Sequence, residues 1–245
     1  MPVLTAKGPV LVHFLDYSQL NSVRTLPYLN EWHRRYVPMG LRVLGVQAPR
    51  FPFGADPAAT ERGLARLEVG FPVVIDDRKL LWTGYGCEGW PSLFLWGRGG
   101  ILRWFHFGEG DYAGTEEAIQ AALGAAFENL PELPAVMDPI RASDAPGAEV
   151  MPPGQELVPF EDRPWTVDDG QAFDVEYEGG GAYATAEGSG QLKITLDGQP
   201  HAEVEVDGPG LYPLAEHDRH GAHRIGIELS GSPAIWSVSF APAVA

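Results

Sequence analysis

The first half of the chain alternates continuous apolar runs with segments whose apolar residues recur every three or four positions. Residues 9–15, PVLVHFL, are apolar and rich in β-branched side chains, which predicts a strand covered on both faces. Residues 22–36 have the spacing of one helix face, and Pro27 interrupts this helix and should kink it. A second buried strand is predicted at 41–47.

The remaining elements of the first half complete a mixed sheet. The sequence predicts a helix at 59–69, strands at 71–76, 90–96 and 101–107, and a closing helix at 115–127. Thr115 is the expected N-cap of the closing helix, and the turn 97–100 is expected to join the last two strands as a hairpin. The order predicts an α/β domain over residues 1–130. A right-handed crossover places the turn at 16–22 at the carboxyl edge of the sheet, where ligands of such sheets usually bind.

The pattern changes twice after residue 130. Residues 131–164 contain 8 prolines and little periodicity, which predicts an extended linker. From residue 165 to 245, apolar and polar residues alternate with a period of two between Gly, Asp and Pro. The predicted strands are 171–178, 190–198, 201–208, 210–216, 223–231 and 234–241. Short alternating strands without a helix predict an all-β antiparallel sandwich or jelly roll.

The net charge of −16 is concentrated in the second half of the chain. Residues 1–130 carry 12 Lys and Arg against 13 Asp and Glu, whereas residues 131–245 carry 5 against 20. A split this sharp indicates two separately built halves. It also argues against nucleic acid or an anionic membrane as a partner, because both attract a basic surface.

The sequence has no membrane-spanning run, no signal peptide and no second cysteine, and these absences limit where the protein is expected to be and whether it can form a disulfide. No apolar run approaches the roughly 18 residues that cross a bilayer. The N-terminal residues lack the basic start and the cleavage site of a signal peptide. Cys87 is the single cysteine, which excludes a disulfide within one chain. We therefore expect a cytoplasmic protein without a cofactor, and the sequence leaves its oligomeric state open.

Several separated motifs of the first half follow the order and spacing of one superfamily. LVHFLDYSQLNS has its strand, turn and helix, with Gln19 and Ser22 at the two redox positions. Pro27 stands where that superfamily has a helix-kinking proline, and Pro91 in Trp90-Pro91 stands where it has a cis-proline. The stretch FHFGEGDYAGTEEAI is similar to the segment before its last helix.

Residues 8–127 therefore resemble the thioredoxin-fold domain of the TlpA/DipZ-like thiol:disulfide oxidoreductases. They also resemble the related domain of NHL-repeat-containing proteins. The second half is similar to the carbohydrate-binding-module-like β-sandwich that follows the thioredoxin fold in DipZ-like proteins, through ITLDG, GLYPL and HRIGIELSGSPAIWSVSF. The resemblance implies a thioredoxin-like α/β fold at residues 1–130, a linker at 131–164 and an acidic β-sandwich at 165–245.

The turn at residues 19–22 lacks the groups that thiol–disulfide exchange needs. That reaction requires a thiolate to attack a sulfur and a second thiol to resolve the mixed disulfide. Gln19 has no ionisable nucleophile, and the hydroxyl of Ser22 is too weak an acid for the helix dipole alone to activate. The sequence therefore predicts a redox-inactive domain with no catalytic residue at this turn.

The geometry of the fold would survive the loss of the thiols. The resemblance implies a shallow groove between the redox turn and the cis-proline loop, whose backbone can pair with an extended peptide. The candidate binding residues are Tyr17, Gln19, Leu20, Asn21, Ser22, Trp90 and Pro91. The alternative is that Tyr17 and Trp90 only pack against the core of the domain.

Other candidate chemistry has weaker support. Cys87 precedes Pro91 by four residues and could act as a lone thiol, although a buried apolar role is more common for such a cysteine. His217, His220 and His223 have a regular spacing near Asp218, but no complete zinc ligand set is indicated, so we expect no metal there. The histidines of the first half, His13 and His106, lie in predicted strands and are expected to be structural.

Three functions remain open at this point. The first is a redox-inactive module that binds a protein or peptide or acts as a scaffold. The second is a thiol-disulfide oxidoreductase or monothiol reductase that uses Cys87. The third is carbohydrate binding by the second half, which would need an exposed row of aromatic residues. The aromatic residues there mostly fit inward-facing positions; they are Phe173, Tyr177, Tyr183, Tyr212, Trp236 and Phe240.

Overall fold

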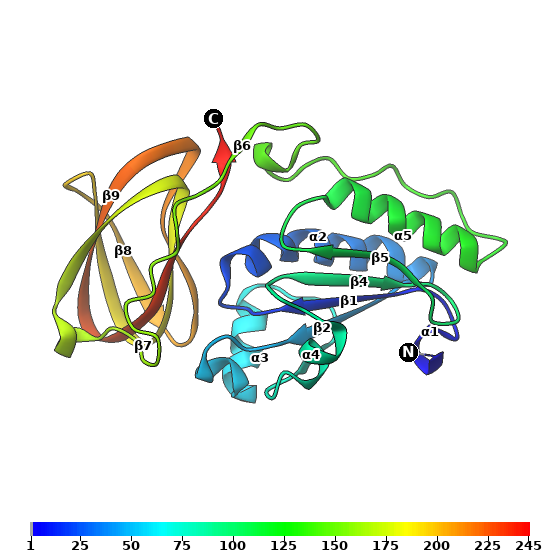
Figure 1. The fold of residues 1–245 in the computed structure, drawn as a ribbon, viewed down its shortest axis with the longest axis horizontal. Coiled ribbons are helices and arrows are strands. Elements are labelled where there is room, and N and C mark those ends of the chain that lie inside the picture. The colour runs from blue at the N-terminus through cyan, green and yellow to red at the C-terminus, as the bar shows by residue number, and fades with distance from the viewer. Residues whose placement is uncertain (1) are drawn as a thin grey trace. The chain divides into compact units, whose positions relative to one another are not determined.

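The computed structural model describes residues 2–245, which form two compact units, residues 2–140 and 141–245. The elements of the first unit are α1 (Pro2–Thr5), β1 (Val10–Leu15), α2 (Leu20–Tyr36), η1 (Val37–Met39), β2 (Arg42–Gln47), η2 (Pro52–Ala55), α3 (Pro57–Arg66), β3 (Val73–Ile75), α4 (Leu80–Tyr85), β4 (Ser92–Trp96), β5 (Leu102–Phe107) and α5 (Tyr112–Ala126). Figure 1 shows their arrangement.

The sheet of the first unit has the strand order β3-β2-β1-β4-β5. Strand β1 is parallel to β2 and antiparallel to β4, and β5 pairs with β4 as a hairpin. Helices α2 and α5 lie on one face of this sheet, and α3 and α4 lie on the other (Figure 1). The mixed sheet flanked by helices that the sequence predicts is therefore confirmed.

Each face of this sheet has its own apolar core. On the α2 and α5 face, Trp32 and Ile119 pack against Leu11 and Leu95 of the two central strands. On the opposite face, β1, β2 and β4 pack under α4; the buried members of this cluster are Val10, Val12, Phe14, Val46, Ala48, Trp82, Cys87 and Phe94. Strand β1 contributes to both cores because all six of its residues are buried.

Two details of the first unit differ from the prediction. Helix α5 begins at Tyr112, and its N-cap is Asp111, which has a positive φ of 45°. The expected N-cap, Thr115, lies inside the helix instead, where its hydroxyl accepts a hydrogen bond from Trp104 Nε1 at 3.2 Å. The short helix α4 is not predicted by the sequence at all.

The first part of the predicted linker packs on the first unit. Leu133 and Met137 contact its core, and Met137 N donates a hydrogen bond to Glu116 Oε2 at 3.0 Å. Ile140 N donates to Tyr28 Oη at 2.7 Å. The first unit thus extends to residue 140 instead of 130, and the rest of the proline-rich segment belongs to the second unit.

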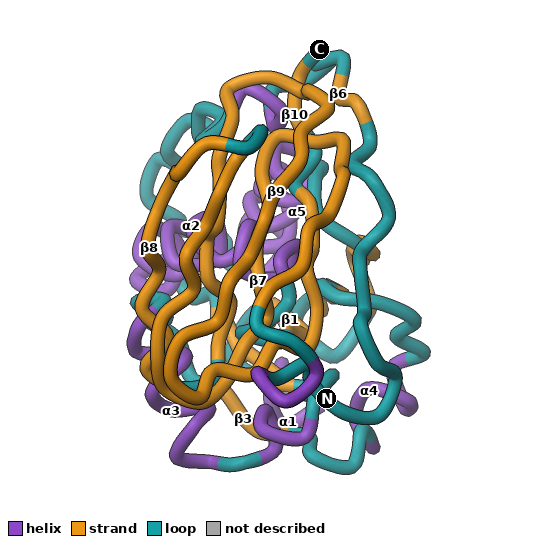
Figure 2. Tube along the Cα trace, turned by 90° about the vertical axis from the view of Figure 1, so that its left-hand side faces the viewer, coloured by secondary structure: helices purple, strands orange, loops and turns teal. Residues whose placement is uncertain are grey.

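The second unit consists almost entirely of strands. Its elements are η3 (Ala142–Asp144), β6 (Val150–Met151), η4 (Val167–Asp169), β7 (Ala172–Leu196), β8 (Gln199–Asp207), β9 (Gly210–Phe240) and β10 (Ala243–Val244). Strands β8, β7 and β9 form an antiparallel sheet in that order, and β10 pairs with β6. Figure 2 follows the trace of these strands. The predicted antiparallel all-β fold is confirmed.

Two very long strands replace five of the six short strands that the sequence predicts. The first two predicted strands are the ends of β7, and the last three form parts of β9. Ala184 in the middle of β7 pairs with both Tyr212 and Val238, so this part of β7 lies between two segments of β9. Gly188, with a φ of 90°, marks a bend in β7, and a Cβ there would lie 2.3 Å from Ser232 O. The strands therefore bend without ending.

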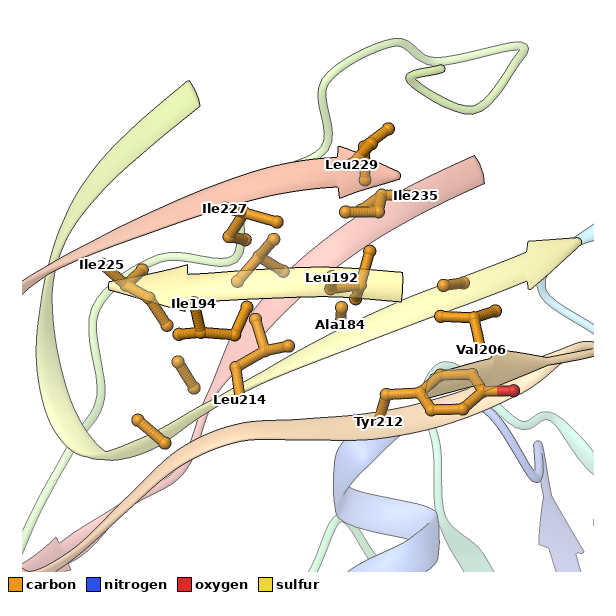
Figure 3. Close-up of a cluster of buried hydrophobic side chains, with 14 of the residues drawn as sticks. Ala184, Leu192, Ile194, Val206, Tyr212, Leu214, Ile225, Ile227, Leu229 and Ile235 are labelled. Atoms are coloured by element: carbon orange, nitrogen blue, oxygen red, sulfur yellow. The ribbon is translucent and has the colours of Figure 1, made fainter. Parts of the chain in front are cut away.

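The core of the second unit is formed by side chains of all three long strands. Leu192 and Ile194 of β7 lie beside Val206 of β8 and Ile225 and Ile227 of β9 (Figure 3). Each of these five side chains is at most 2% exposed. The alternating pattern of these strands therefore places these apolar residues in the core.

None of the helices between residues 2 and 245 has the length and apolar character that crossing a bilayer requires.

Candidate functional site

The turn after β1 is closed by the side chain of Gln19. This residue is the N-cap of α2, with extended backbone angles of φ −101° and ψ 127°. Its Oε1 accepts a hydrogen bond from Ser22 N at 2.9 Å. The amide oxygen thus satisfies one of the free N–H groups at the helix N-terminus, where a thiolate would otherwise be stabilised.

The buried carboxylate of Asp16 organises the same turn from inside. Its Oδ1 accepts hydrogen bonds from Ser18 N at 2.8 Å and Ser18 Oγ at 2.7 Å, and its Oδ2 accepts one from Arg50 N at 2.6 Å. Asp16 N donates in turn to Ser22 Oγ at 3.2 Å. Asp16 and Ser22 are both 0% exposed. The hydroxyl of Ser22 is therefore a structural acceptor within the turn and does not face solvent.

Tyr17, a predicted binding residue, is buried and belongs to the packing of the unit. Its side chain is 1% exposed and lies 6.1 Å from the ring of Phe53, measured between centroids. A Cβ on Gly63 would lie 2.5 Å from Tyr17 Cδ2, so the tyrosine ring occupies the space that this glycine leaves open. The packing alternative for Tyr17 is the one the structure supports, and its placement on the surface of a groove was wrong.

The second wall of the predicted groove is the loop that contains the cis peptide bond between Trp90 and Pro91. The indole of Trp90 is half-buried, and its Nε1 donates to Ala48 O at 2.8 Å. The ring centroid lies 4.5 Å from that of Trp82 and 4.8 Å from Lys79 Nζ. These contacts fix the plane of the indole while leaving part of it accessible to a ligand.

The candidate residues divide into a buried and an accessible group. The buried ones are Tyr17, Leu20, Ser22 and Pro91. Gln19, Asn21 and Trp90 are half-buried and are the members that could contact a partner. The buried members hold the accessible ones in place, so they contribute to the site through its shape and not through direct contact.

Cys87 lies in the apolar core under α4. It is 8% exposed and packs in the same cluster as Val10, Trp82 and Phe94. Burial raises the pKa of the Cys87 thiol to about 11, although a hydrogen bond with Ser92 opposes this rise. Because the thiolate is the reactive species, a pKa this high leaves the thiol protonated and weakly nucleophilic near neutral pH.

Two of the four histidines of the second unit, His217 and His223, form a stacked pair. The rings of His217 and His223 lie 3.9 Å apart between centroids, with 19° between their planes. His217 Nε2 is 2.7 Å from Tyr177 Oη, and His223 Nδ1 is 3.0 Å from Asp197 Oδ2. Burial and the neighbouring His223 lower the pKa of His217. Within the described residues, no group of three or more His, Cys, Asp or Glu side chains is arranged to hold a metal ion.

The sequence analysis missed Asp16 and Gln47 as parts of the site. Gln47 Oε1 accepts a hydrogen bond from Tyr17 N at 3.1 Å, and the side chain is 0% exposed. Their positions in the sequence could have predicted this role, because Asp16 directly follows one apolar strand and Gln47 ends another. Polar side chains at that edge are expected to hold the turns there together.

Comparison with known proteins finds a relative that covers nearly the whole chain and others that cover about half of it. Protein DipZ from Mycobacterium tuberculosis is 27% identical over 268 residues, which cover 94% of this chain and 38% of DipZ. The thiol-disulfide oxidoreductase YkuV from Bacillus subtilis is 25% identical over 120 residues, 49% of this chain and 80% of YkuV. NHL repeat-containing protein 2 from Gallus gallus is 28% identical over 119 residues, 44% of this chain and 16% of that protein. No family model matches the chain.

Solved structures are similar to this chain over about half of its length. The solution structure of a thioredoxin-like protein in its oxidized form is 24% identical, with a TM-score of 0.47 over 51% of this chain and 83% of that one. The chain spans 38% of the length of DipZ. The sequence relatives and the strand order confirm the predicted thioredoxin-like fold and the resemblance to DipZ.

Proposed function

We propose that the thioredoxin-like unit is a redox-inactive module that binds an extended segment of a partner protein at Gln19, Asn21 and Trp90. The observation that carries this proposal is the free backbone of Trp90. Among the described residues, neither its N–H nor its C=O has a hydrogen-bond partner, whereas its indole is held by Ala48 O.

A free backbone edge beside an accessible aromatic ring suits an extended peptide. A peptide can pair with the N–H and C=O of Trp90, in the manner of a strand added to an edge. The half-buried indole offers an apolar contact of the type that often dominates binding energy at interfaces. Gln19 and Asn21 add side-chain amides at the N-terminus of α2, and amides can both donate and accept hydrogen bonds.

The redox-inactive part of the proposal rests on the atoms at the turn. The amide of Gln19 caps α2 at the position of the attacking thiol, and Ser22 Oγ accepts a hydrogen bond from Asp16 N. Neither group can form a disulfide. The turn therefore presents no sulfur atom at the N-terminus of α2.

A binding experiment with defined probes tests this proposal. A phage-displayed library of random peptides is selected against the full chain, and selected peptides are titrated into 15N-labelled protein. We expect extended peptides whose binding shifts the amide signals of Gln19, Asn21 and Trp90. Trp90→Ala should weaken their affinity at least about tenfold, the loss of one hot-spot side chain. Phe105→Ala removes an aromatic ring that is 54% exposed on β5 and should leave the affinity unchanged.

The same experiment has clear negative outcomes. Peptides that bind equally well to the Trp90→Ala variant, or that shift signals elsewhere in the chain, would contradict the proposed site. A library that yields no specific peptide would remove the case for an extended segment as the ligand.

A second candidate function is thiol chemistry through Cys87, which the similarity to the thiol-disulfide oxidoreductase YkuV favours. The burial of Cys87 and the high pKa of its thiol oppose it. Reduction of insulin by dithiothreitol separates the two ideas. We expect the wild-type chain and Cys87→Ser to give the same rate as buffer, whereas turnover that disappears in Cys87→Ser would establish the enzyme.

The third candidate, carbohydrate binding by the second unit, has less support. Four of the six aromatic residues considered for it are buried, namely Tyr177, Tyr212, Trp236 and Phe240. Phe173 is half-buried and packs edge-on against Trp165 with 4.4 Å between ring centroids. Within the described part of this unit, no large aromatic side chain is exposed, so a row on which sugar rings could stack is lacking.

A further inference from the structure

His13 lies in the middle of the central strand β1, on the face that α2 and α5 cover. It pairs with Leu93 of β4, which in turn pairs with His106 of β5. His13 and His106 therefore belong to one row of side chains that crosses three strands on the same face. Burial lowers the pKa of His13 to about 3, so its ring is neutral near pH 7 and has one N–H and one acceptor nitrogen.

A small internal cavity lies beside this ring. His13, Thr25, Trp32, Pro91, His106 and Tyr112 are among the residues that line it. Its free volume is about 10 Å³, which is close to the space that one water molecule needs. The wall of the cavity includes Pro91, the cis-proline that follows Trp90.

Two of the side chains that line the cavity have unpaired polar atoms. Both ring nitrogens of His13 and Nε1 of Trp32 are buried without a hydrogen-bond partner from the described residues. Both side chains are 0% exposed. An unpaired buried polar group costs free energy, and native proteins usually satisfy such groups with a protein atom or an internal water.

We propose that the cavity is a binding site for one internal water molecule. This water accepts a hydrogen bond from the indole N–H of Trp32 and donates one to the acceptor nitrogen of His13. This water pairs two of the three unpaired nitrogens with a single molecule. An aliphatic cavity of this size would stay dry, but the lining residues His13 and Trp32 of this one have unpaired nitrogens that can accept and donate hydrogen bonds. The water also fixes the tautomer of His13, since the nitrogen that it reaches must be unprotonated.

Water–protein cross-relaxation in the full 15N-labelled chain tests the proposal. In NOESY and ROESY spectra we expect the indole proton of Trp32 to show a cross-peak with water of opposite sign in the two experiments. Opposite signs identify dipolar contact with a long-lived water, whereas proton exchange gives the same sign in both. The indole of Trp236 is the control, because it is 6% exposed and donates to Glu187 Oε1 at 2.7 Å. It should show no such peak.

Two variants of His13 separate a bound water from a nearby hydroxyl group. His13→Leu removes the acceptor and should abolish the peak, whereas His13→Asn keeps a polar partner and should retain it. A peak that persists in His13→Leu would come from a hydroxyl of a neighbouring residue and would overturn the proposal. Absence of the peak in the wild-type chain would overturn it as well, without any need for the variants to fold.

Discussion

Gln19 and Cys87 lie in opposite surroundings within the same unit. Gln19 stands half-buried at the N-terminus of a 17-residue helix. Cys87 lies among apolar side chains under α4, where burial raises the pKa of its thiol to about 11. The helix N-terminus at Gln19 would lower the pKa of a thiol, but Gln19 has no sulfur atom. Cys87 has a sulfur atom, but its surroundings raise the pKa of the thiol. Thiol chemistry needs both at one position.

The largest effect is expected when the missing sulfur atoms are placed at the turn. Gln19→Cys with Ser22→Cys, made in a Cys87→Ser background, puts a dithiol at the N-terminus of α2. The helix N-terminus lowers the pKa of the first thiol, so insulin reduction should rise at least about a hundredfold above the uncatalysed rate. Gln19→Ser with Ser22→Cys is the matched control with one thiol, and it should stay at the uncatalysed rate. A silent dithiol variant would show that the turn has lost more than its cysteines.

The second prediction concerns the reactivity of Cys87. At pH 8, a thiol with a pKa near 11 has about a hundredfold less thiolate than one with a pKa of 9.0. We expect Cys87 in the folded chain to react with iodoacetamide at least that much more slowly than in the urea-unfolded chain. Because the pKa is raised, the rate should keep increasing with pH up to about 11. A native rate equal to the unfolded rate at pH 8 would mean that Cys87 is accessible and that its pKa is not raised.

The third effect tests which residues hold the turn in its shape. Asp16→Ala leaves three donors without their acceptor, the N–H and hydroxyl of Ser18 and the N–H of Arg50. We expect it to lower the free energy of unfolding by about 3 kcal/mol in urea titrations. Asp16→Asn retains one acceptor oxygen and should cost less. Asp77→Ala is the surface control, and its effect should stay within about 0.5 kcal/mol. An equal loss in both alanine variants would contradict a special role for Asp16.

The sequence predicts most of the first unit because its elements are long and periodic. The strand at 9–15 and the helix at 22–36 each have a clear period, and the structure has β1 and α2 there. It does not predict α4, because the six residues of Leu80–Tyr85 make fewer than two helical turns and show no period. In the second unit, glycines such as Gly188 resemble turn residues, although they only bend a continuous strand.

The site is less predictable than the fold because its residues depend on contacts between distant parts of the chain. Gln19 and Trp90 are found from their local motifs. The burial of Tyr17 cannot be found from its local motif, because the tyrosine ring occupies the space beside Gly63 of α3, which has no side chain. In the same way, the role of Asp16 depends on the backbone of Arg50, which the fold brings to the turn.

The smallest expected effect separates two roles of Gln19, the N-cap of α2 and a contact residue for a bound peptide. As the N-cap of α2, its Oε1 accepts the N–H of Ser22, and Gln19→Ala should lower the free energy of unfolding by about 1 kcal/mol. Gln19→Asn supplies a shorter but effective cap and should restore most of that loss. If Gln19 also contacts a bound peptide, Gln19→Asn will weaken peptide binding while leaving stability nearly intact. A change in stability without any change in binding would assign Gln19 to the helix alone and leave Asn21 and Trp90 as the contact residues.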